Sequence, residues 1–158
     1  VSAEFHEKLL LRLYRNDYGW DEASRWRDQC PTLKQYQGSK SIYQQLNESR
    51  LLIGTYNATT YLETFSANYP TILFWNPRHW ELRHSAKPYF DDLRKMGILH
   101  DTPESAAKKV NEIFKDPLSW WNQIEIQETI DKFNYHFART SDDWLQKWKN
   151  EFLDVIAE

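Results

Sequence analysis

The chain has 158 residues, of which 41% are hydrophobic and 27% are charged, and its formal net charge is −3. This balance predicts one soluble globular domain with a sizeable core, and it excludes a dedicated nucleic-acid binder because no long run of Lys and Arg is present. No segment is long and apolar enough to span a membrane, so membrane contact would be peripheral at most. The single cysteine, Cys30, excludes an internal disulfide, and with no export signal in view we expect a cytoplasmic location.

The N-terminal third of the chain predicts short elements. A strand is expected over residues 8–14 (KLLLRLY), a loop or short helix over 20–29 and a second strand over 32–36. Ser41 then opens a helix, because Ser41 and Gln44 have the spacing of a capping box.

A strand, helix and strand follow in the middle of the chain. Residues 50–53, bounded by Gly54, form an apolar run typical of a strand that is buried on both faces of a parallel sheet. The next helix is predicted by apolar residues at helical spacing: Ala58, Tyr61, Leu62, Phe65 and Tyr69. Residues 70–75 (PTILFW) predict another strand, which completes a βαβ unit.

The C-terminal half is predicted to be mainly helical. A polar loop over residues 76–86 leads to a helix between Pro88 and Gly97, and residues 98–99 predict a short edge strand. Further helices are expected from Thr102, over residues 116–138, and after Ser141.

This order of elements defines the predicted fold class. Strands that alternate with helices predict an α/β protein with a Rossmann-like parallel sheet of four to five short strands, flanked by helices. The C-terminal helices are rich in aromatic residues, and their helical spacing favours packing into the core over a sugar-stacking platform: Trp120, Trp121, Phe133, Tyr135, Phe137, Trp144, Trp148 and Phe152.

Polar residues at the start of the central helix form the first candidate site. Thr59, Thr60 and Glu63 share one sector beside the carboxyl end of the preceding strand, where ligands of open α/β sheets bind. Free amides of the first turn and the threonine hydroxyls suit a phosphate, and the Glu63 carboxylate can accept hydrogen bonds from a ribose diol. Alternatively, Thr60 and Glu63 form a capping box and only stabilise the helix.

The polar loop over residues 76–86 is expected to overhang the same edge, because it follows the carboxyl end of the next strand. It carries Arg78, Arg83 and His84, for which an ordinary solvated surface is the alternative interpretation. The histidines of this loop lack the spacing of a zinc-binding helix, so the sequence predicts no metal site.

Residues 55–63 (TYNATTYLE), followed by residues 67–72 (ANYPTI), resemble the C-terminal, donor-binding domain of GT-B glycosyltransferases, in particular bacterial surface-carbohydrate transferases. The similarity covers most of the chain. Its other matching segments are Arg12-Leu13-Tyr14, Pro70 to Pro77, Trp80-Glu81-Leu82-Arg83, Pro88-Tyr89-Phe90, Gly97-Ile98-Leu99 and Trp120-Trp121.

This resemblance implies that residues 1–158 are a single domain, the C-terminal nucleotide-sugar-binding domain of a larger two-domain protein in surface polysaccharide or lipopolysaccharide synthesis. A separate N-terminal domain of the same chain would supply much of the site for a glycan or lipid-linked acceptor. The nucleotide sugar would be the substrate, and no cofactor would be required. The implied donor-binding residues are Arg12, Thr55, Asn57, Thr59, Thr60, Glu63, Arg78, Arg83 and His84.

The implied reaction is displacement at the anomeric carbon, in which the departing nucleotide gains negative charge. Fixed cations from Arg12, Arg78, Arg83 and His84 would stabilise that charge without a metal ion. No nucleophile and base pair is complete, so the catalytic residues stay unassigned and the domain is expected to be inactive alone. The alternatives are a non-catalytic interaction domain that docks a partner through its aromatic helices, and a nucleotide-dependent epimerase.

Overall fold

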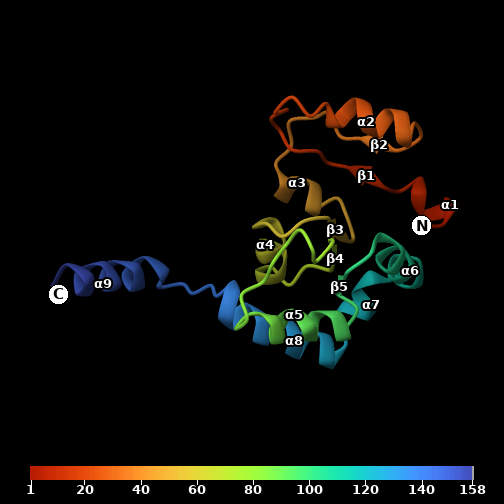
Figure 1. Ribbon diagram of the computed structural model, residues 1–158. Helices are drawn as coiled ribbons and strands as arrows, with labels where there is room; N and C mark the ends of the chain where they lie inside the picture. Colours follow the sequence, from red (N-terminus) through yellow and green to blue (C-terminus); the bar gives the residue numbers. More distant parts are fainter. Residues whose placement is uncertain (158) are drawn as a thin grey trace.

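The computed structural model describes residues 1–157, and within them the chain is an α/β protein with two small parallel sheets (Figure 1). The first sheet pairs β1 with β2, and the second has the order β3-β4-β5. The predicted parallel α/β class is therefore confirmed. A single Rossmann-like sheet of four to five strands is not confirmed, because the strands divide between two sheets. Their bounds are β1 (Leu10–Leu11), β2 (Lys34–Gln35), β3 (Leu52–Gly54), β4 (Thr71–Phe74) and β5 (Leu99–His100).

The polarity of the N-terminal strands explains this division. A strand inside a parallel sheet is buried on both faces and nearly all apolar. By contrast, β2 consists of Lys34 and Gln35, and Leu10 of β1 is 49% exposed. In the larger sheet, Ile72 and Leu73 of the central strand β4 are fully buried. Strand β3 lies at the edge and is only half-buried, so the prediction that both of its faces are buried is wrong.

Two helices connect the strands of the larger sheet, as the predicted βαβ pattern requires. Helix α4 (Thr60–Ser66) leads from β3 to β4, and α5 (Lys87–Lys95) leads from β4 to β5. Helix α5 ends at the predicted glycine. Gly97 has a φ of +67°, which a residue without Cβ adopts at no steric cost, and its N–H donates to the carbonyl of Arg94 at 3.0 Å.

Local side-chain caps start several helices where the sequence predicts them. Ser41 and Gln44 form the reciprocal capping box of α3, with distances of 2.8 and 3.2 Å. The hydroxyl of Thr102 accepts from the backbone N–H of Ser105 at 3.2 Å and caps α6. Besides α4 and α5, the helices before residue 116 are α1 (Ala3–His6), α2 (Glu22–Gln29), α3 (Ile42–Leu46) and α6 (Pro103–Ile113).

The helix predicted over residues 116–138 is broken in two. Helix α7 (Pro117–Trp121) is followed by α8 (Ile124–Phe137), because Gln123 takes an extended conformation with φ −63° and ψ 139°. The break lets Trp121 turn inward, where it is fully buried and its indole N–H donates to Asn68 Oδ1 at 2.7 Å.

The core lies between the larger sheet and the helices that pack around it, α4, α5, α6, α7 and α8. Its centre is aromatic: the ring of Phe65 lies 5.5 Å from Phe133 and 6.0 Å from Trp121. Core packing is therefore confirmed for Phe133, Trp121 and its neighbour Trp120. Among the other aromatic residues predicted to be in the core, Tyr135 at the end of α8 is 61% exposed.

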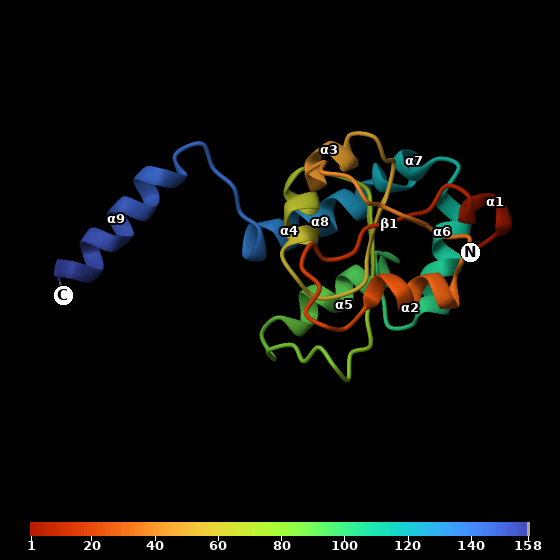
Figure 2. The same cartoon turned by 90° about the horizontal axis from the view of Figure 1, so that it is seen from above.

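The last helix, α9 (Trp144–Ala157), extends away from the rest of the chain (Figures 1 and 2). Its aromatic residues Trp144, Trp148 and Phe152 are each more than half exposed. The prediction that they pack into the core is wrong, because no other described element lies against this helix.

Candidate functional site

The loops that carry most of the candidate residues meet at one edge of the larger sheet. Gly54 at the end of β3 pairs with Leu73, and Phe74 at the end of β4 pairs with His100, so the parallel strands end together. The loop after β3 and the loop after β4 leave from this edge. They touch through the rings of Tyr56 and Trp80, whose centroids lie 6.3 Å apart.

The loop after β3 and the start of α4 present several free polar side chains. Thr55, Thr59 and Glu63 are exposed, and Thr60 is half-buried. In the described part of the chain, these four side chains make no hydrogen bond or ion pair. Asn57 differs, because its Oδ1 accepts from the hydroxyl of Tyr61 at 2.8 Å and thereby ties the loop to α4.

The structure also decides the alternative interpretation of Thr60 and Glu63. A capping box requires its threonine at the N-cap position, but here the N-cap is Thr59, and Thr60 already lies inside the helix. Within residues 1–157, no side chain caps α4. The capping-box alternative is therefore wrong, and the Glu63 carboxylate is left without a structural partner in the described residues.

The loop after β4 is anchored at its start and open further along. Trp75 is 3% exposed and packs 6.0 Å from the ring of Tyr61, and Asn76 Oδ1 accepts from the N–H of Arg78 at 2.9 Å. The side chains of Arg78, Arg83 and His84 are among the exposed ones, and none of them takes part in a hydrogen bond or ion pair within the described residues. These side chains are therefore available to a ligand.

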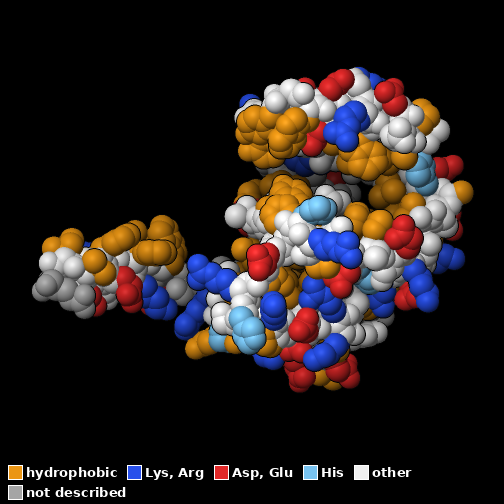
Figure 3. All heavy atoms as spheres, viewed as in Figure 1, with side chains coloured by type: hydrophobic (Ala, Val, Ile, Leu, Met, Phe, Trp, Pro, Cys, Tyr) orange, Lys and Arg blue, Asp and Glu red, His pale blue; other side chains and the backbone are white. Residues whose placement is uncertain are grey.

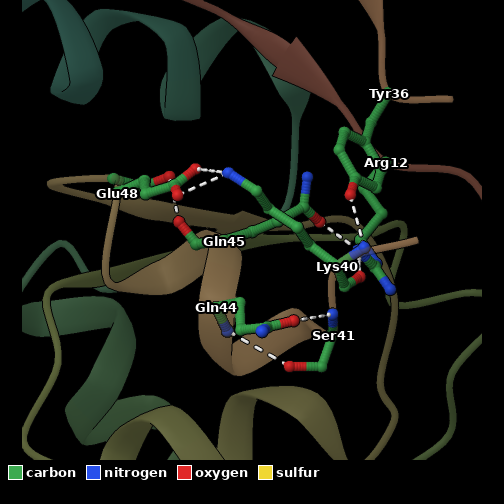
Figure 4. Close-up of polar contacts among 8 residues, drawn as sticks. Arg12, Tyr36, Lys40, Ser41, Gln44, Gln45 and Glu48 are labelled. Carbon is green, nitrogen blue, oxygen red and sulfur yellow. Dashed lines mark hydrogen bonds and ion pairs between the residues drawn. The ribbon is translucent and has the colours of Figure 1, made fainter. Parts of the chain in front are cut away.

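Arg12 occupies a different setting (Figure 4). Its guanidinium donates to the side-chain oxygen of the buried Gln45 and to the carbonyl of Lys40 at 3.0 Å, and it lies 5.5 Å from the centre of the Tyr36 ring. Arg12 thus links the end of β1 to α3. The structure does not show it free at the edge with the other candidate cations.

His100, which lies at the carboxyl end of β5, is not among the site residues predicted from the sequence. Its Nε2 lies 3.0 Å from the Gly97 carbonyl, which can only accept, so Nε2 carries the proton and Nδ1 accepts from the Ser105 hydroxyl at 2.7 Å. Burial lowers the pKa of His100. A shallow cavity of about 340 Å³ opens beside it, lined in part by Arg94 and Asp101. The only signal for His100 in the sequence is its position directly after the apolar residues Ile98 and Leu99.

Within residues 1–157, no group of three or more His, Cys, Asp or Glu side chains could hold a metal ion. In the same range, no helix has the length and apolar character needed to cross a membrane.

Parallel strands with exposed Thr, Glu and Arg side chains at their carboxyl edge define an α/β protein with a polar, open sheet edge. Residues 1–152 match the LIC12162 family transferase, and the chain therefore belongs to this family. Family membership assigns it to the transferases. No curated protein and no solved structure matches the chain.

Proposed function

We propose that this chain is the nucleotide-sugar-binding half of a glycosyltransferase in surface polysaccharide or lipopolysaccharide synthesis, with the donor bound at the carboxyl edge of the larger sheet. The observation that carries the proposal is the contact between Tyr56 and Trp80 at 6.3 Å. Through it, the free hydroxyls and carboxylate after β3 and the free cations after β4 face one ligand.

Each group has a chemical role in this proposal. The hydroxyls of Thr55, Thr59 and Thr60 donate to the donor phosphates, and Glu63 accepts hydrogen bonds from the ribose diol. Arg78, Arg83 and His84 stabilise the charge that develops on the departing nucleotide. Asn57 positions the loop through Tyr61, and Arg12 reaches a phosphate only after it releases Gln45 and Lys40.

The proposal extends to the organisation of the whole enzyme. A GT-B transferase closes its site with a second domain, which would bind the glycan or lipid-linked acceptor and provide the catalytic base. The transferase would then need no cofactor beyond its nucleotide-sugar substrate, and it would act in the bacterial cytoplasm, where a single cysteine stays reduced.

A thermal-shift panel of CMP, CDP, UDP, GDP and their sugars tests the donor site. Because a ligand that binds only the folded state raises the melting temperature, at least one nucleotide is expected to stabilise the chain. Glu63→Ala should abolish that shift and leave the melting temperature of the free protein unchanged, since Glu63 caps nothing.

Glu128→Ala is the matched control, because Glu128 is an exposed helical glutamate on α8 with no hydrogen bond or ion pair in the described residues. The control should keep the full ligand-induced shift. A panel in which no nucleotide stabilises the chain would contradict the proposal.

One observation favours a second candidate function, a non-catalytic domain that docks a partner through its aromatic helices. The apolar residues of α9 are exposed, with Trp148 and Phe152 stacked at 5.5 Å on one face. This candidate predicts no stabilisation by any nucleotide, so the same panel separates the two functions.

A further inference from the structure

Five exposed aromatic side chains gather where three loops leave the carboxyl ends of β1, β3 and β4. Their exposed fractions range from 37% to 65%, although large aromatic residues are usually buried. We call them the aromatic cluster: Tyr14, Tyr18 and Trp20 after β1, Tyr56 after β3, and Trp80 after β4.

The rings of the aromatic cluster contact one another within each side of the cluster. Tyr14 and Tyr18 stack at 5.7 Å with an interplanar angle of 24°, and Trp20 lies 5.9 Å from Tyr18. Tyr56 and Trp80 form the other side at 6.3 Å.

The two sides of the cluster are neighbours. The pKa of Tyr14 is raised, mainly by hydrogen bonding with Tyr18, and Tyr56 on the other side makes the smallest contribution. Figure 3 shows apolar side chains on the loop between β1 and α2, and more of them on the body below, with a hollow between the two parts.

The loop that carries Tyr18 and Trp20 is ordered by hydrogen bonds within the loop. The carboxylate of Asp17 accepts from the N–H groups of Gly19, Trp20 and Asp21 at 2.9, 3.1 and 3.3 Å. Gly19 has a φ of +85°, which strongly favours glycine. The backbone that carries the rings is therefore ordered before a ligand arrives, which lowers the entropy cost of binding.

The position of Tyr56 indicates which ligand group stacks here. Tyr56 lies between Thr55 and Asn57, in the loop that binds phosphate in the proposed function. A nucleotide joins its base to its phosphate through a single ribose, so a base platform must adjoin the phosphate loop. Tyr and Trp rings stack on every nucleobase, because each base has a π face.

We infer that the aromatic cluster is the nucleobase platform of the donor site, with Tyr14, Trp20 and Trp80 as stacking residues. This inference rests on the proposed function and adds the ligand group that the site recognises. It also assigns a binding role to the loop between β1 and α2, which lies outside the larger sheet.

Calorimetric binding of UMP, CMP, GMP and AMP, compared with ribose 5-phosphate, tests the inference. Ribose 5-phosphate has the sugar and the phosphate but no base. At least one nucleotide is expected to bind about tenfold or more tightly than ribose 5-phosphate, because stacking on aromatic rings adds to its affinity. Trp20→Ala should remove most of that margin and leave the affinity for ribose 5-phosphate unchanged. Trp80→Ala should also weaken nucleotide binding, but because Trp80 contacts Tyr56 of the phosphate loop, its affinity for ribose 5-phosphate should fall as well.

Trp26→Ala is the matched control, because Trp26 is an exposed tryptophan (39%) on α2 outside the aromatic cluster. It should bind every ligand as the unsubstituted chain does. Thermal melts of all three variants check that each remains folded.

The possible results separate the inference from the proposed function. If nucleotides bind no more tightly than ribose 5-phosphate, or if Trp20→Ala and Trp80→Ala bind them as well as the unsubstituted chain, the inference is overturned and the donor site stands. If neither ribose 5-phosphate nor any nucleotide binds, both the inference and the proposed function fail.

Discussion

His100 shows how the surroundings of one side chain set its protonation state. Its two ring nitrogens are both satisfied in the neutral form, by Gly97 and Ser105. Burial lowers its pKa most and the nearby Lys109 lowers it further, while the hydrogen bond to Gly97 and the carboxylates of Asp101 and Glu112 act in the opposite direction. The folded chain therefore holds this histidine neutral to a lower pH than the unfolded chain does.

This difference in pKa makes stability depend on pH. The ordinary pKa of histidine is 6.5, and below it the unfolded chain binds more protons at His100 than the folded chain does. The contribution to stability is complete above pH 6.5 and is lost as the pH falls toward the folded value. We expect the urea midpoint to be lower at pH 5.5 than at pH 7.5, and the difference to shrink in His100→Gln.

The exposed His79 provides the control for this measurement. His79→Gln should leave the difference between the two midpoints intact. An equal reduction in both variants would show that His100 is not the source of the pH dependence.

At the scale of elements, the turn between α4 and β4 is joined to the C-terminal helices through one residue. Asn68 has a φ of +49°, and its Oδ1 accepts from the indole of Trp121 at 2.7 Å and from Gln127 Nε2 at 3.1 Å. Asn tolerates this left-handed conformation better than most residues with a Cβ. The same residue thus permits the turn and fixes the break between α7 and α8.

Two substitutions separate these roles of Asn68. Asn68→Ala removes the shorter of two acceptors for the Trp121 indole, which keeps the Asn68 backbone carbonyl at 3.2 Å, and it strains the turn. We therefore expect a loss of about 2 to 3 kcal/mol in the free energy of unfolding. Asn68→Gly removes the same acceptor without the strain and should lose roughly 1 to 2 kcal/mol less. Urea unfolding of both variants measures the difference, and equal losses would show that the turn is unstrained.

At the scale of the whole molecule, α9 is separate from the packed body. All residues of this helix whose burial is described, residues 144–156, are exposed, whereas α8 buries Ile126, Ile130 and Phe133. Both helices have an amphipathic pattern. Within the described chain, only the apolar face of α8 packs against other elements.

Removal of α9 should therefore leave the stability of the body nearly unchanged. A chain that ends at Thr140 is expected to melt within about 2 °C of the full chain, since α9 buries no apolar area against the body. Circular dichroism melts provide the measurement. A fall of 10 °C or more would show that α9 packs on the body in solution.

The accuracy of the sequence predictions follows the range of the interactions involved. The capping box of Ser41 and Gln44, the cap of Thr102 and the glycine end at Gly97 depend on residues within one helical turn, and all three are confirmed. The break at Gln123 was missed, because its reason is the burial of Trp121 against Asn68, a residue distant in the sequence.

The predictions for the candidate site also succeed for local placement and fail for contacts between distant residues. The sequence placed Thr59, Thr60 and Glu63 at the start of a helix beside a strand end, and the structure has them there. It could not show that Arg12 is held by Gln45, since these residues lie on different elements that meet only in the folded chain. The function of Thr59, Thr60, Glu63 and Arg12 in donor binding stays a prediction.

The sequence by itself determined the α/β class, the βαβ unit and most helix ends, because hydrophobic period and capping act over a few neighbouring residues. Only the tertiary structure decided that the strands form two sheets, that α9 stays exposed and that aromatic rings from three loops meet at one edge. Each of these depends on which surfaces pair across the chain. A helical pattern of apolar residues indicates that one face of a helix is apolar, but it does not indicate which other element packs against that face.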